Sequence, residues 1–210
     1  GAAGSKTEEP PPFFPDAFDQ ADRDALSEVL PRLFLSNFRG AENLDGLRAV
    51  GVTSVVCVNG DADDNPHPEE LRYFNIEGVE DEPSQRDRLA AHLEEAAAFV
   101  EEVRGRGEGV VVHCAAGISR SSTVVIFCLM RHHGLRLRAA FELVKQRRPC
   151  IWPNAGFMAC LIEREAALGF VPASMSVDEY EAWGEFRPDE IARAKEVDRP
   201  VACPRLLACD

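Results

Sequence analysis

The sequence HCAAGISRSS spans residues 113–122 and lies between two apolar segments. Val110-Val111-Val112 precedes it, and the largely apolar residues 123–127 follow it. β-Branched residues in an unbroken apolar run favour a buried strand before the loop. The apolar segment after the loop predicts a helix. A strand therefore leads into a tight loop that opens a helix.

This loop has the residues of an anion-binding site that carries a nucleophile. Backbone N–H groups and the positive end of a helix can converge there on a bound oxyanion. Arg120 adds a planar fork of donors that suits phosphate, and the same positive field favours a thiolate at Cys114. A free cysteine is often only a core residue. The spacing and the strand, loop and helix around it favour the catalytic interpretation.

The order of these residues matches HCxxGxxR, the pattern of the cysteine-dependent protein phosphatases, and the longer HCAAGISRSS closely resembles their dual-specificity branch. The resemblance implies that Cys114 attacks phosphorus, that Ser121 hydrogen-bonds the thiolate, and that His113 packs behind the cysteine and orients the loop. It also implies that the phosphoryl oxygens are bound by the loop residues Ala115, Ala116, Gly117, Ile118, Ser119 and Arg120.

An acid is needed to protonate the leaving oxygen of a phosphoester. The resemblance places it on a loop roughly thirty residues before the cysteine, where the segment 76–83 reads IEGVEDEP. Asp81 is the expected general acid and base, with Glu80 and Glu82 as rivals and a solvated acidic turn as the alternative. Asn154 matches an asparagine that supports the loop in relatives, and a plain helix N-cap is an equal interpretation.

Strand-like and helix-like segments alternate through residues 31–170. Strands are predicted at 33–35, 52–58, 72–76 and 109–112, and helices at 41–49, 88–103, 118–132, 135–147 and 155–168. This alternation predicts an α/β fold with a central, mostly parallel, twisted sheet flanked by helices. Its order and length resemble the dual-specificity phosphatase fold. The loop would lie at the carboxyl end of a central strand, where such sheets bind ligands.

The chain is predicted to have three parts, the central one from its strand and helix pattern and the family resemblance and the two flanking ones from composition. Residues 1–30 form an acidic, proline-rich arm, residues 31–170 the catalytic domain, and residues 171–210 an acidic extension. The extension contains a short amphipathic piece with Val177, Tyr180 and Trp183, and a second predicted helix at 189–196.

The net charge of −13 disfavours nucleic acid and anionic membranes as partners. No apolar run is long enough to cross a membrane, and no secretion signal is visible.

The seven cysteines have irregular spacings without a CxxC pair, which favours neither a disulfide framework nor a zinc site. We therefore expect a reducing compartment, cytoplasm or nucleus, and a reaction that needs no metal or cofactor. The oligomeric state is not predicted.

The side chains of the phosphate-binding loop indicate the class of substrate. Lipid phosphatases of this superfamily tend to have lysines inside the loop, and residues 115–119 contain none. A phosphoprotein is therefore favoured over a phosphoinositide, and a MAP kinase is one candidate. Kinase-directed relatives usually carry a basic docking domain upstream of the catalytic domain. Residues 1–30 are acidic and too few to form one. The closer resemblance is therefore to the atypical, single-domain members. A binding-only pseudophosphatase remains an alternative, and a rhodanese-type sulfurtransferase is a weaker one.

Cys57, where relatives often carry asparagine, is either a small buried residue or a disulfide partner for oxidised Cys114.

Overall fold

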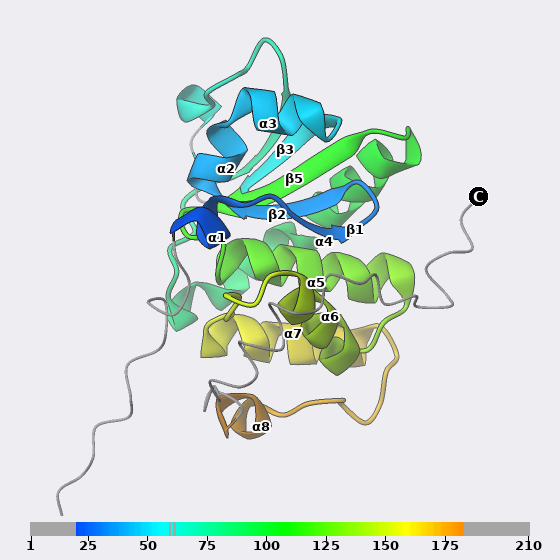
Figure 1. Ribbon diagram of the computed structural model, residues 1–210. Helices are drawn as coiled ribbons and strands as arrows, with labels where there is room; N and C mark the ends of the chain where they lie inside the picture. Colours follow the sequence, from blue (N-terminus) through cyan, green and yellow to red (C-terminus); the bar gives the residue numbers. More distant parts are fainter. Residues whose placement is uncertain (1–19, 59, 61, 183–210) are drawn as a thin grey trace, which may run out of the picture.

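The computed structural model describes residues 20–58, 60 and 62–182. It is a three-layer α/β fold with helices on both faces of one sheet (Figure 1). The five strands are β1 Ser27–Leu30, β2 Leu33–Asn37, β3 Val52–Val58, β4 Arg72–Ile76 and β5 Gly109–Cys114. Their order is β1-β2-β5-β3-β4, and only the β1–β2 pair is antiparallel. The predicted α/β class with a mostly parallel sheet is confirmed.

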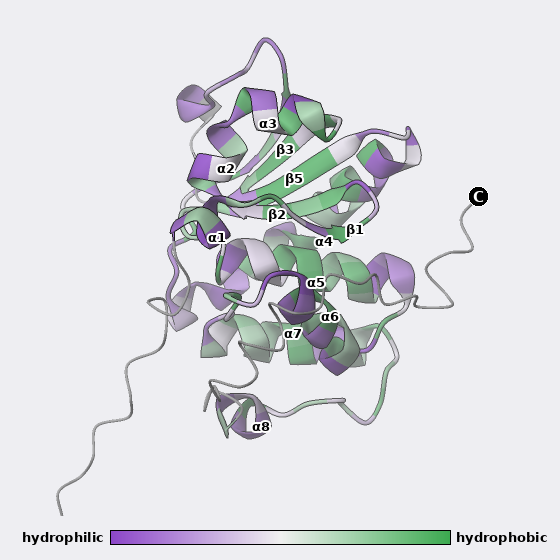
Figure 2. Ribbon diagram, viewed as in Figure 1, coloured by the Kyte–Doolittle hydropathy of each residue, from purple (hydrophilic) through white to green (hydrophobic). Residues whose placement is uncertain are grey.

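The helices divide between the two faces of the sheet. The N-terminal helices are α1 Gln20–Asp24, α2 Phe38–Glu42 and α3 Leu44–Ala49. The later ones are α4 Arg86–Gly105, α5 Arg120–His133, α6 Leu137–Arg147, α7 Ala155–Ala167 and α8 Val177–Ala182. Short 3₁₀ turns occur at Ala62–Asp64 and Pro83–Gln85. A small core lies under α3, and the main core lies between the sheet and α4 to α7. Figure 2 shows the apolar residues concentrated on the strands and inner helix faces.

Three N-terminal elements differ from the sequence prediction, one of them the five-residue helix α1, which was not predicted. The helix expected at 41–49 is two helices, because Asn37 and Asn43 each accept a bond from a backbone amide of the first turn, Gly40 N–H at 3.0 Å and Gly46 N–H at 3.1 Å. Strand β1 was not predicted. It has only four residues and is followed by Pro31, so its sequence signal is weak.

The remaining strands and helices agree with prediction to within a few residues. The four strands expected at 33–35, 52–58, 72–76 and 109–112 are all present. Asn154 caps α7, as expected, by accepting a hydrogen bond from Phe157 N–H at 3.0 Å. Trp183 and the helix expected at 189–196 lie outside the described residues. No helix in the described part of the chain is long and apolar enough to span a bilayer.

Helix α5 is enclosed by the rest of the molecule. Eleven of its fourteen residues are buried, and it contacts α4, α6, α7 and β5. A helix surrounded in this way has little freedom to shift. The loop that precedes α5 therefore has a rigid support on its C-terminal side.

Glu165 is a fully buried carboxylate that joins three elements. It accepts hydrogen bonds from Leu137 N–H at the start of α6, at 2.9 Å, and from Ser174 N–H, at 2.7 Å. Burial acts to raise the pKa of Glu165, but these bonds and the nearby Arg136 outweigh it and hold the pKa below its usual value.

We expect Glu165→Ala to lower the free energy of unfolding by about 2–4 kcal/mol, because it leaves one buried and one partly buried N–H group without an acceptor. The measurement is the urea midpoint. Glu163→Ala in the same helix is the matched control. Glu163 is exposed and pairs with Arg86, so its loss should stay within about 1 kcal/mol. Equal losses in the two variants would contradict this role for Glu165.

Candidate active site

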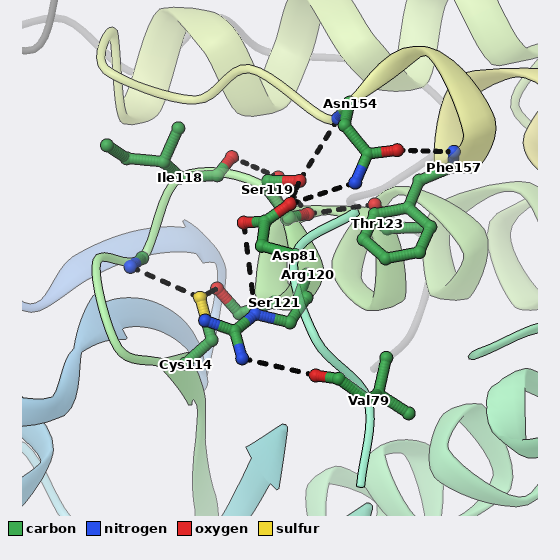
Figure 3. Close-up of polar contacts among 12 residues, drawn as sticks. Val79, Asp81, Cys114, Ile118, Ser119, Arg120, Ser121, Thr123, Asn154 and Phe157 are labelled. Carbon is green, nitrogen blue, oxygen red and sulfur yellow. Dashed lines mark hydrogen bonds and ion pairs between the residues drawn. The ribbon is translucent and has the colours of Figure 1, made fainter. Parts of the chain in front are cut away.

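The loop 115–119 begins at the carboxyl end of β5, at the same edge where β2, β3 and β4 end. Cys114 is the last residue of β5 and is 2 % exposed. Its Sγ accepts a hydrogen bond from Gly117 N–H at 3.3 Å and lies 3.2 Å from Ser121 Oγ (Figure 3). The sulfur is therefore held by one donor from the loop and by one hydroxyl from the first turn of α5.

The loop carbonyl groups are bonded to groups outside the loop. Ala115 O accepts from Phe38 N–H, Gly117 O from Arg148 Nε, and Ile118 O from Trp152 N–H, at 3.4, 2.9 and 2.9 Å. In a trans peptide unit the N–H points opposite to the C=O. The amides of residues 116, 118 and 119 therefore face the interior of the loop, as an anion site requires.

Gly117 allows the loop to lie close to β2. Its φ of +67° is in the left-handed region, and a Cβ there would lie 2.5 Å from Ser36 O. Only glycine fits both conditions. This explains why the pattern needs glycine three residues after Cys114.

Arg148 fixes the loop from behind and was not predicted as a functional residue. Its guanidinium, only 1 % of the residue being exposed, donates to Gly117 O at 2.9 Å, Ala25 O at 3.2 Å and Arg23 O at 2.7 Å. Burial lowers the pKa of Arg148, while the nearby cysteine Cys114 acts in the opposite direction. The sequence signal was weak, because Arg148 stands in an ordinary basic run, KQRR, at the end of α6.

Arg120 lies at the start of α5, and 7 % of it is exposed. Its Nη1 donates to Val79 O at 3.2 Å, and its Nε lies 3.8 Å from Asp81 Oδ2. Val79 is fully buried, so it anchors the segment that carries Asp81. Asp81 and Arg120 are therefore brought together, although 39 positions separate them in the sequence.

Asp81 is held by two donors on one oxygen (Figure 3). Oδ1 accepts from Ser119 Oγ at 2.6 Å and from Asn154 Nδ2 at 2.9 Å, while Asn154 N–H donates to Ser119 Oγ at 3.0 Å. Sequence reasoning placed Ser119 in the phosphate loop and Asn154 behind it. It missed their joint contact with Asp81, because hydrogen bonds between such distant residues leave no local pattern.

His113 and Cys57 lie side by side on β5 and β3, next to a pocket of about 240 Å³ that also reaches Cys114 and Ala115. Burial raises the pKa of Cys57 to about 11, and Cys114 adds to the shift. Cys57 is half-buried rather than fully buried. Its disulfide with oxidised Cys114 stays a prediction.

Burial lowers the pKa of His113 from 6.5 to about 4. Between these values the unfolded chain binds a proton that the folded protein does not. The free energy of unfolding therefore falls as the pH falls through this window, by about 2 kcal/mol at pH 5. We expect His113→Gln to remove this part of the pH dependence. Urea unfolding of both proteins at pH 7 and pH 5 measures it, and identical slopes would show that His113 does not contribute.

A cysteine, an arginine and an acid around an amide-lined loop, at the carboxyl edge of a parallel sheet, are typical of the cysteine-dependent phosphatases. The family model "Dual specificity phosphatase, catalytic domain" matches residues 33–167. The chain belongs to this family.

Individual relatives agree with this assignment. The chain is 39% identical over 144 residues to mouse "Dual specificity protein phosphatase 2", and the alignment covers 69% of this chain and 44% of that protein. It is 32% identical over 186 residues to human "Dual specificity protein phosphatase 22", covering 88% of this chain and 94% of the relative. The crystal structure of human DUSP28 aligns with a TM-score of 0.63 and 36% identity, over 69% of this chain and 95% of that one. The chain spans less than half the length of several curated relatives that it matches.

Proposed function

We propose that this protein hydrolyses phosphate monoesters of tyrosine and of serine or threonine in phosphoproteins. The observation that carries the proposal is the position of Cys114 Sγ. It lies in hydrogen-bond contact with Gly117 N–H and Ser121 Oγ, at the base of a loop whose amides face inward. Arg120 and Asp81 lie at the same loop. Membership of the dual-specificity family supports the breadth of substrates.

In the first half of the proposed reaction, Cys114 Sγ attacks phosphorus, and an S–P bond forms as the bond to the leaving oxygen breaks. The leaving oxygen takes the proton from Asp81. Arg120 and the amides of the loop, contributed by Ala115, Ala116, Gly117, Ile118, Ser119 and Arg120, hold the three other oxygens. The product is a cysteinyl-phosphate and a free hydroxyl group.

In the second half, water attacks phosphorus, and Asp81 takes one of its protons. The S–P bond breaks and the electron pair returns to Cys114 Sγ. Ser121 Oγ, 3.2 Å from the sulfur, donates a hydrogen bond to the departing thiolate and so stabilises it. His113 and Asn154 support these groups, His113 next to the cysteine and Asn154 through its bond to Asp81.

We assign catalysis to residues 31–170, with 1–30 as an N-terminal arm and 171–210 as an extension. The proposed partner is a phosphoprotein, and a MAP kinase is one candidate, because the relatives include a Dictyostelium "MAP kinase phosphatase with leucine-rich repeats protein 3". The cytoplasm or nucleus is the proposed compartment. All five cysteines in the described part of the chain are free thiols, which suits a reducing environment.

A binding-only function is the second candidate. The crystal structure of a human "tyrosine phosphatase-like serine/threonine/tyrosine-interacting protein" aligns with a TM-score of 0.63 and 32% identity, over 69% of this chain and 98% of that one. Against this candidate, Cys114 is present here together with the hydrogen bonds that hold its sulfur.

Hydrolysis of a substrate panel tests the proposed function. The panel contains phosphotyrosine, phosphoserine and doubly phosphorylated peptides, together with phosphoinositides. We expect turnover of the peptides, with kcat/KM for them at least about tenfold above that for the lipids, because no lysine in residues 115–119 is available to hold further phosphates. A preference for lipids would overturn the substrate class, and binding without turnover would favour the second candidate.

A further inference from the structure

Helix α8 packs against the turn that precedes α7, although it lies beyond residues 33–167 of the family match. Its Tyr180 is only 1 % exposed. The phenol donates a hydrogen bond to Pro153 O at 2.5 Å. The ring stacks on Trp152 with centroids 4.4 Å apart and meets Phe141 edge-on at 5.5 Å. Tyr180 is therefore a specific, fully packed contact rather than a loose surface one.

The turn that Tyr180 holds is bonded directly to the active loop. Trp152 N–H donates to Ile118 O at 2.9 Å, and Asn154 N–H donates to Ser119 Oγ at 3.0 Å. The side chain of Asn154 then donates to Asp81 Oδ1. A shift of Pro153 would therefore move both donors on Asp81, because Asn154 is adjacent and Ser119 is bonded to it.

The charge environment is consistent with this arrangement. Burial raises the pKa of Tyr180, and the negative charge of Asp81 raises it further. The phenol thus stays neutral and remains a hydrogen-bond donor at neutral pH. A second attachment holds the same segment elsewhere, where Ser174 bonds to Glu165 and to Arg138 N–H.

We propose that Tyr180 is a positioning residue for Asp81. The helix α8 fixes the turn 152–154, so that Ser119 and Asn154 occupy Oδ1 and leave Oδ2 to carry the proton that the reaction transfers. Oδ2 is the oxygen that faces Arg120, at 3.8 Å from Nε. This inference rests on the proposed role of Asp81 as general acid, and it brings a residue from outside the matched domain into the working site.

Tyr180→Phe tests the proposal, because it removes one oxygen and keeps the stacked ring. The substrates are phenyl phosphate, whose leaving group needs a proton, and p-nitrophenyl phosphate, whose leaving group needs it far less. We expect kcat/KM for phenyl phosphate to fall about five- to tenfold, a part of the 10²–10⁴-fold available to a general acid. For p-nitrophenyl phosphate the fall should stay below about twofold. A purely structural defect would lower both alike.

Two further variants make the result decisive. Ser174→Ala removes a hydroxyl from the same segment away from the turn, and it should leave the ratio between the substrates unchanged. Asp81→Asn should produce the same selective loss at larger size, and Tyr180→Phe added to it should have no further effect. Equal losses on both substrates, no loss, or full additivity with Asp81→Asn would overturn the role of Tyr180. If Asp81→Asn itself showed no selectivity, the proposed role of Asp81 would fail instead.

Discussion

Replacing Cys114 by serine should abolish turnover while leaving the fold and the phosphate site in place. We expect kcat for p-nitrophenyl phosphate to fall by at least about 10⁴-fold, which is typical when the nucleophile of an enzyme is replaced. A serine hydroxyl is a far weaker nucleophile at neutral pH than a thiolate held in a positive field. The substitution removes little volume, and Gly117 N–H and Ser121 Oγ remain beside the new oxygen.

Binding provides the second measurement for this variant. Because the loop amides and Arg120 are untouched, Cys114→Ser should bind a phosphotyrosyl peptide within about threefold of the wild-type affinity. Cys160→Ser, in α7, is the matched control, since it changes the same atoms outside the site and should keep its activity. If wild type and Cys114→Ser were equally inactive, the protein would be a binding module and not an enzyme.

Arg120→Lys should have the second largest effect, a loss of about 10²–10³-fold in kcat/KM. Lysine keeps the positive charge of Arg120. The loss in kcat/KM therefore measures what the planar guanidinium, with its several N–H donors, adds beyond charge alone. The largely buried guanidinium of Arg120 donates to Val79 O through Nη1, which leaves its other N–H groups for the phosphoryl oxygens in the proposed reaction. The single ammonium group of lysine cannot make both sets of contacts at once. The segment that carries Asp81 also loses one of its attachments.

Inhibition by inorganic phosphate checks this interpretation. Its affinity should weaken in Arg120→Lys, whereas Arg72→Lys, which alters an exposed ion pair with Glu102, should match wild type in both measurements. A kcat/KM within about tenfold of wild type for Arg120→Lys would show that the fork is not essential.

The sequence predicted those features of the fold and the site that depend on residues close together along the chain. The loop 113–121 combines a nucleophile, a glycine and an arginine at fixed spacing, and buried strands such as 52–58 are marked by a continuous run of largely apolar, β-branched residues. Asp81 was found only through the family resemblance, because one aspartate in an acidic turn has no distinctive local signal. Two supports of the site, Arg148 and Tyr180, could not be predicted. Arg148 and Tyr180 act through backbone carbonyls, Gly117 O and Pro153 O, and acceptors of that kind exist at every residue.

The hydrogen bonds of Arg148 have a consequence for the order in which the protein matures. They join Gly117 O to Arg23 O and Ala25 O, which lie 125 and 123 positions away from Arg148 along the chain. During synthesis, Cys114 and its loop leave the ribosome well before Arg148 does, so the loop cannot yet have its final support. Contacts of such high sequence separation form late in folding. We therefore expect a nascent chain ending before residue 148 to be catalytically silent, with activity gained only when the two halves of the polypeptide meet.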